Sequence, residues 1–181
     1  NRTIVFSTTD PYFTVDGVSR SIDVYHRSAS PYSDTDSYKL VTSGASLRFG
    51  VPFTESDTVY FGGGVERTRI VPGTNLPAAY ANYANQFGFS SNSVPLTVGW
   101  SRDSRDSALA PHRGSYTRVS ADMSTMDLRY YKLSGQQQYY LPLGRAFTLA
   151  LNGQMDWAKT YGNSGKAFPV IKNMYAGGIG S

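Results

Sequence analysis

The sequence predicts an all-β fold in which about eight long antiparallel strands form part of a transmembrane β-barrel. Apolar residues alternate with polar or small residues through most of the chain, as expected for strands with two different faces. The alternating segments run for roughly 8–15 residues, which suits a tilted strand crossing a bilayer better than a short globular strand. Aromatic residues make up 14% of the chain and charged residues only 17%, which favours strands over disorder.

The alternation is clearest between residues 145 and 158, where one face is apolar and the other becomes increasingly polar. A lipid-facing exterior and a wet interior account for two such faces, provided that the sheet closes. The apolar face carries Phe147, Leu149, Leu151, Met155 and Trp157, and the polar face carries Asn152, Gln154 and Asp156. The same rhythm predicts strands over residues 2–9, 18–28, 41–51, 59–66, 94–101, 118–123 and 129–141.

The connections between these segments differ in length. Residues 52–57 and 142–145 are short and turn-like, whereas 71–92 is long and 29–38 is rich in Ser, Asp and Pro. Outer-membrane barrels combine short periplasmic turns with longer external loops. Within the long connection, only residues 77–87 have a helical composition, so we expect one short loop helix there.

Composition excludes several classes of protein. The absence of Cys rules out a disulfide framework, a thiolate zinc site and a cysteine nucleophile. The net charge of +4 is spread along the chain without a Lys/Arg cluster, so we expect no nucleic-acid partner. No segment is apolar for long enough to form a transmembrane helix.

No arrangement of residues indicates catalysis or cofactor binding. His26 and His112 are far apart and lack the context of a triad or a metal site. The run Gly62-Gly63-Gly64 lacks the Lys-Ser/Thr of a phosphate loop, so we interpret it as a place where a barrel wall bends or another segment approaches. The sequence therefore predicts neither an enzyme, nor a cofactor, nor a bound metal.

Aromatic residues near strand ends predict contact with the membrane interface. Trp100, Tyr131, Tyr139 and Trp157 lie on the apolar faces, where they suit an interfacial aromatic belt, with cross-strand packing as the alternative. Together with Phe147, Leu149 and Leu151 they form the predicted lipid-facing set. Tyr60, Tyr130 and Tyr140 fall on the opposite faces and are expected to line the interior.

Three motifs resemble the barrel of the BamA family of outer-membrane assembly proteins. The segment Asp10-Pro11-Tyr12-Phe13-Thr14-Val15-Asp16-Gly17-Val18 resembles a turn of that barrel, and residues 105–114 resemble one of its periplasmic turns. The end of the chain, 174–181 with Tyr175, Gly177 and Gly178, resembles the approach to the family's inward-folded loop. The motifs follow the family's order and spacing, and the resemblance covers the whole chain and is greatest for β-proteobacterial members.

The resemblance implies that residues 1–181 supply roughly the fourth to eleventh strands of a 16-stranded barrel. Both ends of the chain look cut from a longer protein. The periplasmic POTRA domains, the first and last strands and the Val-Arg-Gly motif of the inward loop would then lie outside this sequence. Residues 10–17, 52–57, 103–114 and 142–145 would face the periplasm.

The implied function is the folding and insertion of β-barrel proteins in the outer membrane of a Gram-negative cell. The implied partners are outer-membrane lipids, unfolded outer-membrane proteins and accessory assembly lipoproteins. The turn formed by Asp10, Pro11, Tyr12, Phe13, Asp16 and Gly17 could bind a partner, although a plain β-turn explains its Pro and Gly.

Other functions remain open at this stage. A two-partner secretion or translocation-assembly transporter belongs to the same superfamily, and a diffusion porin or a soluble ligand-binding barrel represents another class. A soluble barrel would place the polar face outside and the apolar face around a cavity. Because an open sheet has unpaired edges, we expect the 181-residue piece alone not to be a stable soluble monomer.

Overall fold

Eight antiparallel strands form one sheet in the computed structural model, which describes residues 2–30, 38–144, 147–162 and 166–172. Each strand pairs with its neighbours in chain order, and the sheet does not close in the described part. The predicted all-β fold with about eight strands is therefore confirmed. The strands are β1 (Arg2–Asp10), β2 (Ser19–Ala29), β3 (Tyr38–Pro52), β4 (Asp57–Pro72), β5 (Ser90–Asp103), β6 (Gly114–Met126), β7 (Tyr130–Pro142) and β8 (Thr148–Thr160).

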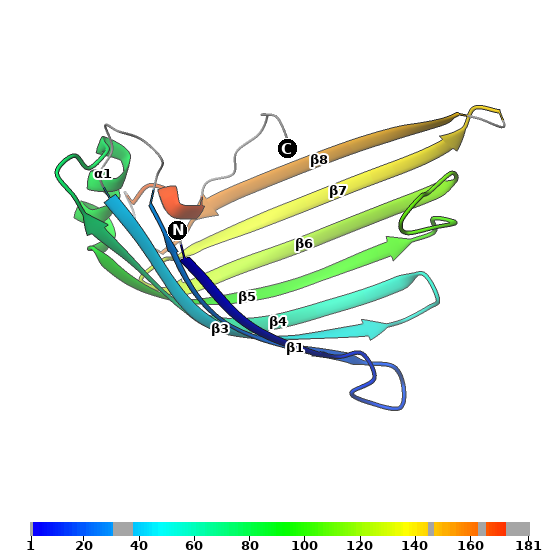
Figure 1. Ribbon diagram of the computed structural model, residues 1–181, viewed down its shortest axis with the longest axis horizontal. Helices are drawn as coiled ribbons and strands as arrows, with labels where there is room; N and C mark the ends of the chain where they lie inside the picture. Colours follow the sequence, from blue (N-terminus) through cyan, green and yellow to red (C-terminus); the bar gives the residue numbers. More distant parts are fainter. Residues whose placement is uncertain (1, 31–37, 145–146, 163–165, 173–181) are drawn as a thin grey trace.

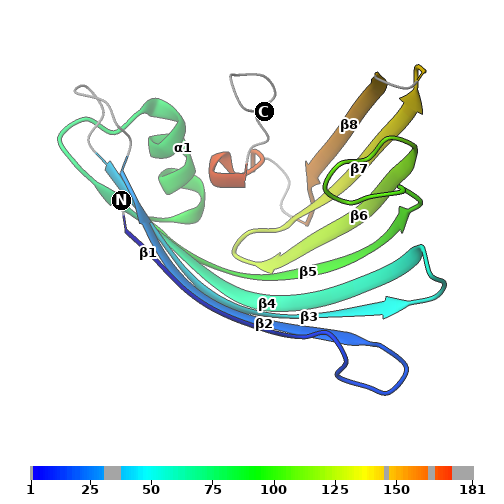
Figure 2. The same ribbon diagram turned by 45° about the vertical axis from the view of Figure 1, so that its right-hand side comes forward.

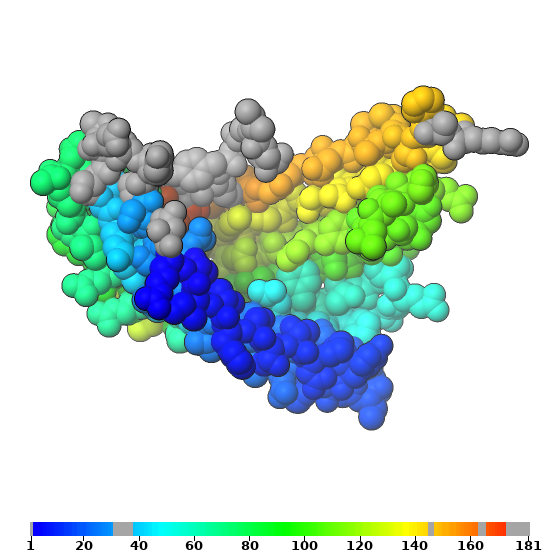
Figure 3. Space-filling model, viewed as in Figure 1, coloured from blue at the N-terminus to red at the C-terminus, as the bar shows by residue number. Residues whose placement is uncertain are grey.

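The sheet is strongly curved, so it has a concave and a convex face (Figures 1 and 2). The connections β1–β2, β3–β4, β5–β6 and β7–β8 lie at one end, which we call the turn end. The opposite end, the helix end, carries α1 (Ala78–Phe87) and the short 3-10 helix η1 (Val170–Lys172). The space-filling view shows β1 and the β1–β2 turn along one open border of the sheet (Figure 3).

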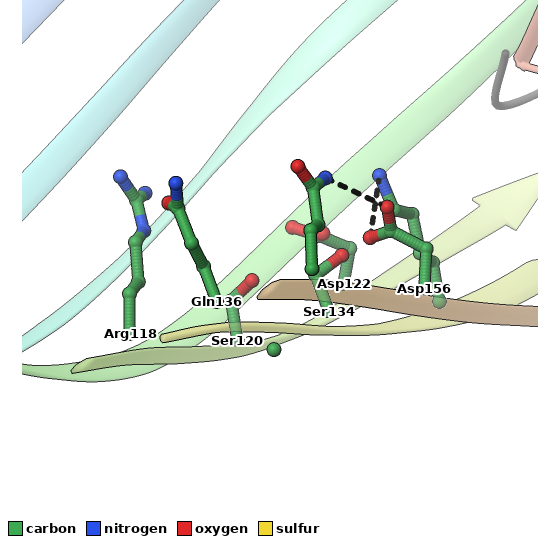
Figure 4. A pocket seen from close by; sticks show the side chains of 9 residues that line it. Arg118, Ser120, Asp122, Ser134, Gln136 and Asp156 are labelled. Carbon is green, nitrogen blue, oxygen red and sulfur yellow. Dashed lines mark hydrogen bonds and ion pairs between the residues drawn. The ribbon is translucent and has the colours of Figure 1, made fainter. Parts of the chain in front are cut away.

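The strand register continues each face across the sheet. Phe49 pairs with Phe61, and the row continues through Val98, Ala121, Leu133 and Trp157. The adjacent row contains Tyr60, Gly99, Ser120, Ser134 and Asp156. The second row belongs to the concave face, because Figure 4 shows Ser120, Ser134 and Asp156 pointing into a pocket on the inner side of the curved sheet. The apolar row is therefore convex, opposite to the arrangement of a soluble ligand-binding barrel.

The glycine run lies where β3 and β4 approach each other very closely. A Cβ atom at Gly62 would lie 2.5 Å from the Leu47 carbonyl oxygen and 3.0 Å from the Arg48 Cα. A Cβ at Gly64 would meet the Ala45 carbonyl oxygen. Only glycine leaves room for the neighbouring backbone at these two positions.

The helix over residues 77–87 is confirmed as α1, with Pro77 at its N-cap. Proline suits the start of a helix because its missing N–H would have no intrahelical partner there. Among the described residues, no helix is long and apolar enough to cross a membrane.

Several strands, β4 and β5 among them, extend further than the alternation predicts. β4 continues from Glu66 to Pro72, and β5 begins at Ser90 rather than at Val94. Pro95 lies inside β5, where the pairing with β4 runs from Leu96 directly to Ser93, while β6 still pairs with Pro95. A proline weakens a strand prediction because it cannot donate to the ladder, but it is tolerated where one neighbour carries the pairing.

Candidate functional site

An apolar cluster at the helix end joins the long loop to the segment after β8. Its buried centre consists of Ile70, Tyr83, Leu128 and Tyr130, contributed by β4, α1, the β6–β7 turn and β7. Leu128 is fully buried and Ile70 is 1% exposed, although most of this open sheet has no core. We call this cluster the cap, and it also includes the partly buried residues Leu40, Leu76, Tyr80, Phe87, Phe168, Val170 and Ile171.

Polar contacts on the concave face connect the cap to the sheet. The Lys172 ammonium of η1 lies 2.6 Å from Oε1 of Glu66 on β4. The hydroxyl of Tyr25 on β2 donates to Oε2 of the same carboxylate at 2.7 Å. The Glu66 carboxylate therefore links two strands and the segment after β8.

A second tyrosine crosses the sheet in the same way. Tyr60 on β4 lies over Gly99 on β5, where any Cβ would collide with the tyrosine ring. Its hydroxyl accepts a hydrogen bond from Arg118 Nε on β6 at 2.8 Å, and the guanidinium also lies 4.8 Å from the ring centroid. Glycine on the middle strand thus allows an aromatic side chain to join strands that are not neighbours.

Tyr60→Phe is expected to lower the free energy of unfolding by about 1 kcal/mol, because the Arg118 guanidinium loses its hydroxyl acceptor. Denaturant unfolding in phospholipid vesicles measures the change. Tyr139→Phe is the matched control, since the Tyr139 hydroxyl makes no hydrogen bond to another described residue. An equal loss in both variants would contradict the assigned role of the Tyr60 hydroxyl.

Between β6 and β8 the concave face contains a polar hollow of about 220 Å³ (Figure 4). Gln154 Nε2 donates to Asp156 Oδ2 at 2.8 Å, and the Lys132 ammonium lies 3.8 Å from the other carboxylate oxygen. Arg118 and Gln136 stand at one side of the hollow. This mixture of amides and paired charges suits a wet surface, and the described residues contain no cluster of three or more His, Asp or Glu that could hold a metal.

The members of the predicted lipid-facing set that lie in strands share the convex face of the sheet. Trp157 pairs with Leu133 and packs against Tyr131 at a ring distance of 5.3 Å. Leu151 pairs with Tyr139, and Trp100 pairs with Val119. Leu149 pairs with Leu141, and Phe147 is exposed just before β8. These positions agree with contact to lipid, which stays a prediction.

The predicted interior residues lie on the concave face. Tyr60 and Tyr130 are buried there, and Tyr140 is partly buried. The expected approach to an inward loop (Tyr175, Gly177 and Gly178) lies outside the described residues.

The Asp10–Gly17 segment forms the β1–β2 turn. Asp10 accepts a hydrogen bond from the Tyr12 amide at 3.1 Å, and Gly17, with φ near 80°, donates to the Thr14 carbonyl. Phe13 packs under the Arg20 guanidinium, 4.1 Å from the ring centroid. Pro11, Tyr12 and Asp16 are exposed, so a partner could reach them. Binding of a partner at this turn stays a prediction.

The β5–β6 turn is organised by one carboxylate. Asp106 Oδ1 accepts hydrogen bonds from the amides of His112 at 2.9 Å and Arg113 at 3.2 Å. These bonds favour the ionised form and lower the pKa of Asp106 below its ordinary 3.8. The lowered pKa means that the carboxylate stabilises the folded turn above its ordinary pKa, and that this stabilisation disappears as the pH falls through the lowered value.

The amide proton shifts of His112 and Arg113 should therefore titrate together, with a midpoint below 3.8. Nuclear magnetic resonance in detergent micelles can follow both signals. Asp106→Asn should abolish the titration, because the amide side chain has no charge to lose at acid pH. A midpoint at or above 3.8 would contradict this account.

Sequence patterns did not identify the Tyr25, Glu66 and Lys172 contact. Lys172 is 106 positions from Glu66, and both residues are ordinary polar residues in their local context. The one available indication was the alternation, which placed Tyr25 and Glu66 on the polar faces of two predicted strands, 18–28 and 59–66, with the predicted strand 41–51 between them.

Comparisons with known proteins agree with this geometry. A model of the Omp85 superfamily domain matches residues 1–181. The outer membrane protein assembly factor BamA of Neisseria meningitidis serogroup B is 39% identical over 188 residues, covering 97% of this chain. The crystal structure of BamA from Haemophilus ducreyi lacking POTRA domains 1–3 superposes with a TM-score of 0.83 and 25% identity over 99% of the chain.

The chain spans only part of these relatives. It covers 24% of the Neisseria protein and 36% of the Haemophilus chain. The resemblance noted in the three sequence motifs is nevertheless confirmed over the full length. The chain belongs to the Omp85 superfamily, and its eight strands are part of a β-barrel of the bacterial outer membrane.

Proposed function

We propose that this protein takes part in folding β-barrel proteins and inserting them into the outer membrane. The observation that carries the proposal is the 39% identity to a protein named as an outer membrane assembly factor, which extends over 97% of the chain. The structural similarity to a second BamA supports the same assignment. The action is non-covalent, and we propose no catalytic role.

The proposed partners are outer-membrane lipids, unfolded outer-membrane proteins and accessory lipoproteins. The convex face supports the first of these, because exposed Leu, Met and Trp side chains continue across neighbouring strands. We also propose that residues 1–181 form roughly the fourth to eleventh strands of a 16-stranded barrel. In that arrangement the first and last strands of the barrel and the periplasmic POTRA domains lie outside residues 1–181.

A segment exchange tests the function. Residues 1–181 replace the matching stretch of the Neisseria BamA, and the chimaera is expressed while the resident protein is depleted. We expect growth to continue and folded, heat-modifiable porins to keep accumulating in the outer membrane. The matched control is the same chimaera with Met155→Arg, which should fail because a charge replaces an apolar side chain on the convex face.

The alternatives give different results in this experiment. A chimaera that folds in the membrane without restoring porin assembly would overturn the proposal. Secretion of an extracellular partner protein by the full-length protein, without porin assembly, would then favour a two-partner secretion transporter. Diffusion of small solutes alone would favour a porin.

A further inference from the structure

Three exposed cations, which we call the basic patch, lie on the convex face near the helix end. Arg67 and Arg69 belong to β4, and Lys39 belongs to β3. Ile70 follows Arg69 and belongs to the buried centre of the cap, and Leu40 packs against the same cluster. Because successive side chains of a strand point to opposite faces, the three cations point away from the cap and its concave face.

The strand pairing sets the spacing of the basic patch. Arg67 and Arg69 are two positions apart on one strand, so their Cα atoms are about 7 Å apart. Lys39 pairs with Val71 and is therefore the diagonal neighbour of Arg69, at about 7–8 Å. Lysine and arginine side chains are long enough to converge on one anionic group over such distances.

No carboxylate neutralises the basic patch within the described residues. None of the ion pairs found there involves its three members, and Arg67 donates from Nε to the Ser90 hydroxyl at 3.2 Å. At the turn end of the same face, by contrast, Arg102 stands opposite Asp57 of the neighbouring strand. Like charges on neighbouring positions repel one another, so the basic patch favours a bound anion.

Apolar side chains continue from the basic patch toward the middle of the sheet. Val65, two positions before Arg67, is 60% exposed on the same face. The neighbouring exposed residues of this face are Leu47, Phe61 and Leu96. A cationic border beside an apolar wall matches a membrane lipid, because the headgroup and the acyl chains of a lipid lie at these two levels.

We propose that the basic patch binds the phosphate group of a membrane lipid whose acyl chains lie on the apolar side chains beside it. A phosphate offers several acceptor oxygens to cationic donors, and arginine matches it with two parallel hydrogen bonds. A lipid in the bilayer reaches the patch by moving along the barrel wall. The inference rests on the proposed contact of the convex face with lipid, and it adds the chemistry of the headgroup and the residues that hold it.

Binding of lipid A to the full-length protein tests the site. Lipid A carries phosphate on an acylated sugar, and it suits the outer leaflet, which the helix end would face if the turn end faces the periplasm. Fluorescent lipid A is titrated into the protein in an uncharged detergent. Arg69→Gln should weaken binding about fivefold and the double variant Arg67→Gln, Arg69→Gln about thirtyfold, because each cation near a headgroup contributes a similar factor.

Arg102→Gln is the matched control, since it removes the same charge from the same face at the turn end. It should leave the affinity within about twofold of the parent, because its carboxylate neighbour makes that site unfavourable for an anion. Arg69→Lys keeps the charge and should also stay within about twofold. Heat-modifiable migration on gels verifies that each variant is folded, and the single variants decide the matter if the double variant does not fold.

The ligand provides a second comparison. Lipid A without its phosphates should bind the parent and the double variant alike, because the acyl chains remain and the anionic group is gone. Inorganic pyrophosphate should compete only weakly, since it has no chains to lie on the apolar wall.

Three results would overturn the inference. Folded parent and double variant could bind lipid A equally, or Arg102→Gln could weaken binding as much as Arg69→Gln. Pyrophosphate could also bind as tightly as lipid A, which would indicate a site for a soluble anion. Porin assembly is scored in parallel with the chimaera: lipid binding without assembly would remove the proposed function and leave the inference standing, and assembly without lipid binding would do the reverse.

Discussion

Met155→Arg is expected to destabilise the protein in lipid by about 2–4 kcal/mol, the cost of a cation near the middle of a bilayer on a barrel's outer face. Met155 lies near the middle of β8 on the convex face and is 77% exposed. In a protein surrounded by water, replacing so exposed a side chain would change stability by less than about 0.5 kcal/mol. The size of the effect therefore reports which solvent covers this face.

Gln154→Arg provides the matched control at the residue that precedes Met155. Gln154 lies on the concave face and donates to Asp156, which an arginine can also do. We expect this variant to stay within about 0.5 kcal/mol of the parent. Urea unfolding in short-chain phospholipid vesicles compares the two. A larger loss of unfolding free energy for Gln154→Arg than for Met155→Arg would show that the convex face is not the one in contact with lipid. It would then contradict the assignment of the sheet to a membrane barrel.

The alternation in the sequence predicted the faces of the sheet well because a strand has only two faces. Once Leu149, Leu151 and Trp157 share a face, the register carries that assignment to each neighbouring strand. The helix over 78–87 could also be predicted, since its composition differs from that of the strands around it. Strand ends such as Ser90 were harder to predict, because Pro95 interrupts the local pattern. The strand continues through Pro95 because it pairs with β6 there, and this pairing is visible only in the structure.

The contacts across the concave face could not be predicted from local patterns. Tyr25, Gly44 and Glu66 belong to three strands, and their meeting depends on the register of two separate pairings. A shift of one residue in either pairing would separate the tyrosine from the carboxylate. Lys172 depends on a further non-local event, the return of the chain over the sheet. Sequence similarity supplied the family, whereas the structure supplied these contacts.

The second large effect is expected at the glycine run of β4. Gly62→Ala should lower the free energy of unfolding by about 1–3 kcal/mol, because the new methyl group collides with backbone atoms that cannot move without shifting a whole strand. The Cβ would lie 2.5 Å from the Leu47 carbonyl oxygen. A flexible side chain could rotate away from such a contact, but the β3 backbone is held in its ladder by pairing with β2 and β4.

Gly153→Ala on β8 separates this steric effect from the general effect of replacing a strand glycine. A Cβ at Gly153 would find no atom within 4 Å. Alanine there restricts the unfolded chain without a clash, so we expect a gain of about 0.4–1 kcal/mol. The difference in unfolding free energy between the two variants, measured in the same vesicles, then reports the contact at Gly62. Equal changes at both positions would mean that β3 and β4 can separate locally, and that the glycine run is not required for the curvature of the wall.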